Sequence, residues 1–181
     1  YLKIQNSNLL FGLLFQNDIS DEQKALLGAQ FNLSETVFVS KLPKDQESDG
    51  QFFIRWFSAI EEIQLCGHAT MAASYILYTE NHMYSSLISQ DKPLRFKTNF
   101  GDRLEVTFDG QRVTLNFPLN PPAPMASSEW LEELKKHTLG SDQVPKDLFI
   151  EAQFAPKIRY MILRLKDGAD IGTMNPEFSR L

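Results

Sequence analysis

Hydrophobic and polar positions divide the first third of the chain into three strand-like runs. These runs are rich in Val, Thr and aromatic residues, a composition that favours β-structure. They are LLFGLLF (9–15), TVFVSKL (36–42) and FFIRWF (52–57). The polar, Gly-containing stretch between the second and third runs predicts a loop.

Two segments between these strands predict helices. Ser20 and Gln23 have the spacing of a capping box, so a helix is expected from there to about Phe31. The residues expected to face inward are Ala25, Leu26, Leu27 and Ala29. The second segment, GHATMAASYILY (67–78), is apolar nearly all round and rich in small residues, which indicates a buried helix that other backbones approach closely.

Three further β-rich runs follow: LRFKTNF (94–100), RLEVTFD (103–109) and QRVTLNFPL (111–119). Asp109-Gly110 predicts a hairpin with a type I′ turn, in which both central residues have positive φ. Alternation of Leu104, Val106 and Phe108 places them on one buried face of an antiparallel meander. The expected fold class is therefore α+β, with a mostly antiparallel sheet curled around one buried helix.

The segment NPPAP (120–124) breaks the pattern and predicts a linker. After it come a predicted helix (127–140), a short strand near 148–150, a strand at 159–165 and the start of another helix. These elements are too few to close a sheet of their own. We therefore predict a first domain over residues 1–119, and a linker with the incomplete start of a second domain over 120–181.

Composition narrows the function classes. The 181 residues carry a net charge of -5, and their basic residues are scattered, which gives no support for nucleic-acid binding. No apolar run is long enough to predict a membrane span. The single cysteine excludes an intrachain disulfide and favours a cytoplasmic location. The three histidines are far apart in sequence, so a metal site is not expected.

Glu35 is the first candidate for chemistry. It follows Ser34 in a turn that enters a strand, with Leu33, Val37 and Phe38 around it. A carboxylate at the mouth of an apolar pocket is desolvated, which is how enzymes obtain an acid/base group that works near neutral pH. The alternative is that this carboxylate only caps the turn.

The second candidate is LCGHAT (65–70). A helix beginning at Gly67 would present free N–H groups and positive partial charge to a carboxylate, and His68 could hydrogen-bond a substrate or simply pack. Cys66 could be a thiol activated by the helix terminus, or a small buried residue. Glu61 and Glu62 are expected to be a solvated pair.

The segments ISDEQKALLGAQFNLSETVFV (19–39) and FFIRWFSAIEEIQLCGHATMAASYILY (52–78) closely resemble the phenazine biosynthesis-like (PhzF-like) family of the diaminopimelate-epimerase-fold superfamily. The resemblance implies two similar domains, each a barrel-like sheet around a central helix, with the active site between them. It also implies a cofactor-independent isomerase or epimerase that moves a proton on a small carboxylate, and a possible homodimer.

By the same resemblance, Glu35 is the catalytic residue, and the substrate is held by Gly67 and His68 together with Ser34, Ala69 and Asn8. Near the N-terminus the family has a GNPAAV-like motif, of which this chain keeps only Asn8. The second-domain DPVTGSA-like segment of the family does not occur in these residues. We therefore expect impaired activity. The alternatives are a non-catalytic binding or interaction protein, and a racemase that uses Cys66.

Overall fold

A computed structural model describes residues 2–3, 11–15, 19–46, 50–80, 87–125, 129–139, 148–157 and 160–174. The chain forms two compact units, Tyr1–Pro118 and Leu119–Leu181. That the first unit is an epimerase-like domain and the second the incomplete start of another stays a prediction.

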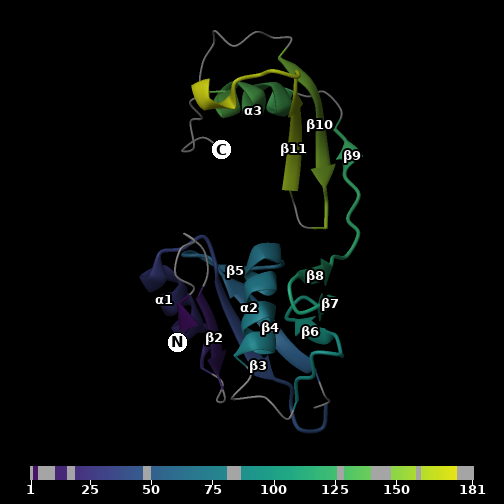
Figure 1. Cartoon of the computed structure of the whole chain (residues 1–181). Helices are drawn as coiled ribbons and strands as arrows, with labels where there is room; N and C mark the ends of the chain where they lie inside the picture. Colours follow the sequence, from purple (N-terminus) through teal and green to yellow (C-terminus); the bar gives the residue numbers. More distant parts are fainter. Residues whose placement is uncertain are drawn as a thin grey trace. The chain divides into compact units, whose positions relative to one another are not determined.

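The first unit contains the predicted strands and both predicted helices (Figure 1). Its elements are β1 (Leu2–Lys3), β2 (Phe11–Phe15), α1 (Asp21–Phe31), β3 (Thr36–Lys41), β4 (Gln51–Phe57), β5 (Glu62–Ile63), α2 (Gly67–Thr79), β6 (Leu94–Thr98), β7 (Arg103–Phe108) and β8 (Val113–Asn116). The predicted capping box at Ser20 and Gln23 is present. Leu9 and Leu10 lie outside the described residues.

The strands of this unit form one sheet in the order β1-β2-β3-β4-β6-β7-β8, with β5 paired to β4. Among the described strands, β2–β3 and β4–β6 are parallel and the other pairs are antiparallel. Parallel neighbours need a crossover connection, and α1 and α2 provide the two crossovers. Helix α2 contacts β2 and β3 as well as β7 and β8. The sheet therefore curls around α2, and the predicted fold class is confirmed.

Strands β3 and β4 are buried on both faces. Val37 and Trp56 belong to the core cluster around α2, whereas Phe38 and Phe57 pack under α1 on the opposite face, with their rings edge to face. Two-sided burial explains why Val37, Phe38 and Val39 form a continuous apolar run instead of alternating with polar residues. Burial on both faces also holds the backbone of β3 in place immediately after Glu35.

The predicted inward face of α1 is partly wrong. Leu26 is 69% exposed and Ala29 is exposed, whereas Lys24 and Gly28 are buried. A Cβ at Gly28 would lie 2.9 Å from the carbonyl oxygen of Ser58, so only glycine allows this approach to the end of β4. The helix turns its smallest residue to the sheet, and this orientation points Leu26 to solvent.

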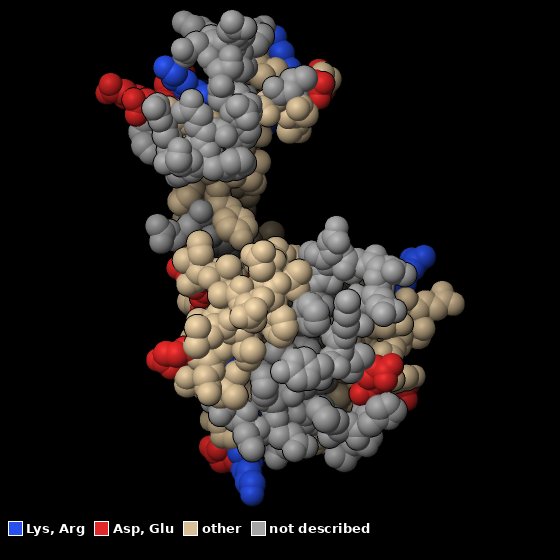
Figure 2. All heavy atoms as spheres, turned by 90° about the vertical axis from the view of Figure 1, so that its left-hand side faces the viewer, with Lys and Arg blue, Asp and Glu red and all other residues tan. Residues whose placement is uncertain are grey.

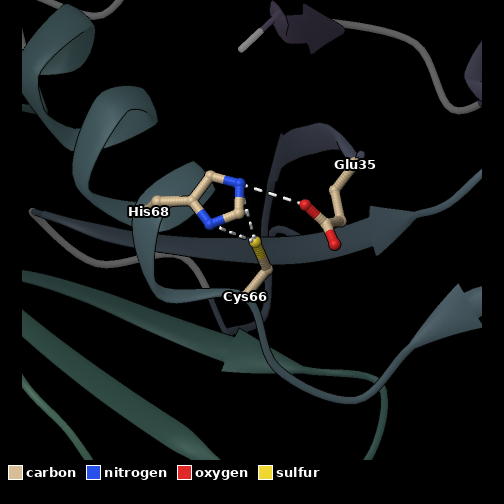
Figure 3. Close-up of side chains that lie close together, drawn as sticks. All are labelled: Glu35, Cys66 and His68. Carbon is tan, nitrogen blue, oxygen red and sulfur yellow. Dashed lines mark hydrogen bonds and ion pairs between the residues drawn. The ribbon is translucent and has the colours of Figure 1, made fainter. Parts of the chain in front are cut away.

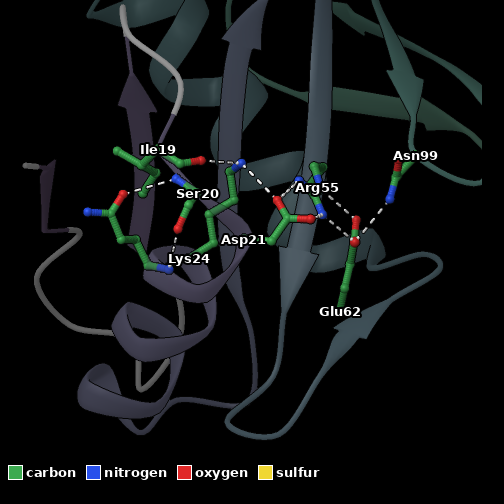
Figure 4. Close-up of polar contacts among 8 residues, drawn as sticks. Ile19, Ser20, Asp21, Lys24, Arg55, Glu62 and Asn99 are labelled. Carbon is green, nitrogen blue, oxygen red and sulfur yellow. Dashed lines mark hydrogen bonds and ion pairs between the residues drawn. The ribbon is translucent and has the colours of Figure 1, made fainter.

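Arg55 holds α1 against β4 (Figure 4). Its guanidinium donates to both carboxylate oxygens of Asp21 and to both of Glu62. Glu62 also accepts from Asn99, and its side chain is 15% exposed. The prediction of a solvated Glu61–Glu62 pair is therefore wrong for Glu62, because a buried arginine on the neighbouring strand needed an acidic partner.

Helix α2 is buried except for one stripe of side chains. Ala69, Ala73 and Leu77 are in the core, whereas Met71 is 41% and Tyr75 46% exposed. The exposed positions continue the line of His68 at helical spacing. The predicted buried helix is therefore confirmed, and the curled sheet leaves this one stripe of it uncovered.

The predicted hairpin between β7 and β8 is confirmed, but its turn type is wrong. The last strand pair is Phe108 and Val113, so the loop is longer than a type I′ turn. Gly110 has a φ of +92°, whereas Asp109 is not at positive φ. Its carboxylate instead accepts hydrogen bonds from the N–H groups of Gln111 and Arg112.

The second unit comprises β9 (Ala123–Pro124), α3 (Glu129–Leu139), β10 (Phe149–Ala155), β11 (Tyr160–Leu165) and the 3₁₀ helix η2 (Ile171–Thr173). Its sheet has the order β11-β10-β9. The predicted NPPAP linker therefore contains an edge strand, a position that tolerates proline. Residues 175–181, part of the predicted last helix, lie outside the described residues.

The described surface carries mixed charge. On the face drawn in Figure 2, the Lys and Arg side chains lie apart from one another. Within the described ranges, no helix is both long enough and apolar enough to cross a membrane.

Candidate active site

Glu35 lies one residue before β3, on the same side of the strand as Val37, and so faces the start of α2. Its side chain is 20% exposed, and Oε2 is 3.0 Å from Nε2 of His68 (Figure 3). That oxygen is buried and has no hydrogen bond of good geometry in the described structure. Oε2 therefore pairs with the imidazole of His68, in a position where it could also accept a proton or a ligand.

Cys66, Gly67 and His68 begin helix α2. Cys66 is the N-cap, and its carbonyl accepts from the backbone N–H and from the hydroxyl of Thr70. Its sulfur lies 3.5 Å from Nδ1 and 3.7 Å from Nε2 of His68. The imidazole, 45% exposed, is thus close to both the buried thiol and the carboxylate of Glu35.

The environment of Cys66 keeps it a thiol. Burial raises the pKa of Cys66 to about 12, and the negative charge of Glu35 adds to this rise. The backbone N–H groups of Ala69 and His68 oppose it only in part. These surroundings favour a small buried residue over a thiolate nucleophile.

Phe117, just after β8, covers the start of α2. A Cβ at Gly67 would lie 2.3 Å from Cζ of Phe117, so the absence of a side chain lets the ring approach this helix terminus. Phe117 is itself 47% exposed. Phe117 was not predicted as a site residue. The signal that could have identified it is a glycine at the helix start together with an aromatic residue at the end of the meander.

The remaining predicted site residues differ in exposure. Ser34 is exposed in the turn that precedes Glu35. Ala69 is fully buried, so its contribution would be its backbone N–H rather than its side chain. Asn8 lies outside the described residues.

Glu35, Cys66 and His68 also form a possible ligand set for a metal ion. One donor atom from each lies within 4.8 Å of the others. Sequence spacing gave no sign of this set, because Glu35 comes from the start of β3 and the other two from the start of α2.

The curled sheet around a central helix defines a protein of the diaminopimelate-epimerase-like fold. A PhzF-family protein from Enterococcus faecalis has a similar structure, with a TM-score of 0.63 and 26% identity over 93% of this chain and 55% of that one. A structure from Pseudomonas aeruginosa described as a predicted epimerase is similar in fold, with a TM-score of 0.55 and 15% identity. A sequence model of the family described as phenazine biosynthesis-like protein matches residues 8–181. The chain belongs to this family.

Curated relatives extend the match. A phenazine biosynthesis-like domain-containing protein of Pongo abelii is 32% identical over 160 residues, which are 87% of this chain and 51% of the relative. An uncharacterized isomerase of Pseudomonas aeruginosa is 31% identical over 163 residues, 90% of this chain and 53% of the relative. The chain spans about half the length of the curated relatives it matches.

Proposed function

We propose that the chain is part of a PhzF-like isomerase or epimerase, in which Glu35 transfers a proton on a small carboxylate substrate. The observation that carries this proposal is the buried Oε2 of Glu35, which lacks a well-formed hydrogen bond and faces His68 at the start of α2. Family membership and a relative named as an isomerase support the same class of reaction.

In this mechanism Glu35 removes a proton from one carbon of the substrate and returns it to another. The electron pair of the broken C–H bond enters the conjugated system of the substrate and forms the new C–H bond, so the step is balanced without a redox cofactor. One carboxylate can serve as base and then as acid when it lies beside the substrate plane. We therefore propose that the reaction is cofactor-independent.

The substrate carboxylate is proposed to bind at the start of α2. The helix terminus carries positive partial charge, and donors placed there oppose negative charge that develops in the transition state. The N–H groups of Gly67, His68 and Ala69 belong to this first turn, and the His68 ring adds a polar contact. Ser34 and Asn8 are proposed as further polar contacts to the substrate.

These residues are proposed to form one side of the substrate pocket. Full activity then requires groups on the far side of the substrate, and this chain alone is expected to be impaired. A sensitive assay is therefore needed, and exchange of a carbon-bound substrate proton with D2O, followed by NMR, detects turnover that is too slow for product analysis.

The test compares Glu35→Gln with the native chain on a panel of cyclic and unsaturated carboxylates. We expect exchange to fall by at least ~100-fold, the lower end of general acid–base contributions. Glu61→Gln is the matched control, because Glu61 is exposed and outside the site, and it should keep native exchange. Unchanged exchange in Glu35→Gln would reject the role of Glu35. Binding of a carboxylate without exchange in the native chain would instead support a non-catalytic binding protein.

A further inference from the structure

We propose that Glu35, Cys66 and His68 form a binding site for one thiophilic divalent cation, represented by Zn²⁺, and that the bound cation prevents proton transfer by Glu35. The inhibitory part rests on the proposed function. Cation binding itself does not rest on the proposed function, because it depends only on the three side chains.

The distances among the donor atoms fit such an ion. With zinc about 2.3 Å from sulfur and about 2.0 Å from nitrogen, a tetrahedral angle places the sulfur and nitrogen roughly 3.5 Å apart. The observed distance from Sγ of Cys66 to Nε2 of His68 is 3.7 Å. Nε2 lies 3.0 Å from Oε2 of Glu35. The third distance, between sulfur and carboxylate, is within 4.8 Å, so a modest contraction is needed.

The side chains allow that contraction. His68 is 45% exposed, so its ring can turn to aim Nε2 between the sulfur and the carboxylate (Figure 3). Cys66 is held by the start of α2 and Glu35 by the start of β3, two elements that pack together in the core. The Glu35 side chain is partly exposed and has three side-chain torsions, so its carboxylate can approach the sulfur without a change in the backbone.

The donor set selects the class of cation. Sulfur, imidazole nitrogen and carboxylate oxygen together suit Zn²⁺, whereas Mg²⁺ and Ca²⁺ prefer oxygen ligands alone. Three protein ligands leave a fourth position for water. On binding, the thiol of Cys66 loses its proton to solvent and a sulfur–zinc bond replaces the sulfur–hydrogen bond. Oε2 of Glu35, which lacks a well-formed hydrogen bond, gains a charged partner.

A bound cation and the isomerase reaction would exclude each other. The lone pairs of Glu35 that accept the substrate proton are the ones that coordinate the metal, and the metal also takes Nε2 of His68. Zinc should therefore inhibit competitively with substrate, and a chelator should restore activity.

Calorimetric titration of the tag-free chain with ZnCl₂ tests the site directly. We expect one ion per chain, with affinity at least about tenfold weaker in Cys66→Ser and in His68→Asn. His137→Asn is the matched control, because His137 lies on α3 in the other unit, and it should bind as the native chain does. Co²⁺ should give a thiolate charge-transfer absorption that Cys66→Ser abolishes. Because His68 is half-exposed, its variant tests the site even if Cys66→Ser does not fold.

Absence of zinc binding, or equal affinity in the native chain and both site variants, would overturn the site. The failure of the two proposals can be told apart. Zinc binding together with unchanged proton exchange in Glu35→Gln would leave the metal site standing and reject proton transfer by Glu35. Proton exchange that zinc does not inhibit would remove the proposed inhibition and leave the isomerase standing.

Discussion

Arg55 joins α1 to β4, and its loss should weaken the first unit far more than the loss of a surface charge. Its side chain is 10% exposed and donates to both Asp21 and Glu62. Arg55→Met keeps the apolar stem but leaves Glu62, 15% exposed, without its charged partner. Breaking a buried pair costs about 3–5 kcal/mol. Asp21 is 63% exposed and water can solvate it, so its share is small, and we expect a loss of about 2–3 kcal/mol.

Urea unfolding measures this loss. Trp56 and Trp130 are the two tryptophans, one in each unit, so a Trp130→Phe background limits the fluorescence signal to the first unit. A double-mutant cycle with Glu62→Gln should give a coupling energy of about 1–2 kcal/mol. Arg55→Lys should fall between the native chain and Arg55→Met, because an ammonium cannot span two carboxylates. A loss below about 0.5 kcal/mol, or strict additivity with Glu62→Gln, would refute the reasoning.

A change from glycine to alanine usually stabilises a helix. Gly28→Ala should instead destabilise the first unit by about 1–3 kcal/mol in the same assay, because the added carbon meets a backbone carbonyl. Leu26→Ala, at an exposed site, is the control and should change stability by less than about 0.5 kcal/mol. The pKa of Asp21 is lowered to about 2, chiefly by its hydrogen bond from Arg55. The stability it adds is therefore present above its unfolded pKa of about 3.9 and lost as pH falls toward 2, and Asp21→Asn should flatten this part of a stability–pH curve. Iodoacetamide at pH 8 should modify Cys66 at least ~10-fold more slowly in the folded chain than in urea, because burial raises the pKa of this thiol to about 12; equal rates would contradict this.

Local sequence signals predicted most elements of the fold. Ser20 and Gln23 determine the start of α1 through contacts within one turn, and such contacts are visible in sequence. The side of α1 that faces the sheet could not be predicted from the sequence, because it depends on whether Leu26 or Gly28 fits against the end of β4. A glycine carries no hydrophobic signal, yet here its small size decides which face is buried.

The candidate site was predictable residue by residue but not as a cluster. The motifs around Glu35 and His68 marked each as unusual and gave the family resemblance. Their 3.0 Å separation depends on how β3 and α2 dock, which no spacing along the chain expresses. Phe117 was missed because an aromatic residue at the end of a strand is typical of the core. Its closeness to Gly67 follows only from the curl of the sheet.

The assembly of the site from distant segments offers a way to find its ligand without knowing the reaction. Glu35 and His68 meet only when β3 and α2 are packed, so the unfolded chain has no such site. A compound that binds there stabilises the folded state by mass action, and at 100 times its Kd adds about 2.7 kcal/mol. A thermal-shift screen of small carboxylates, with the Glu35→Gln chain as reference, would therefore rank candidate substrates by the melting temperature of the protein alone.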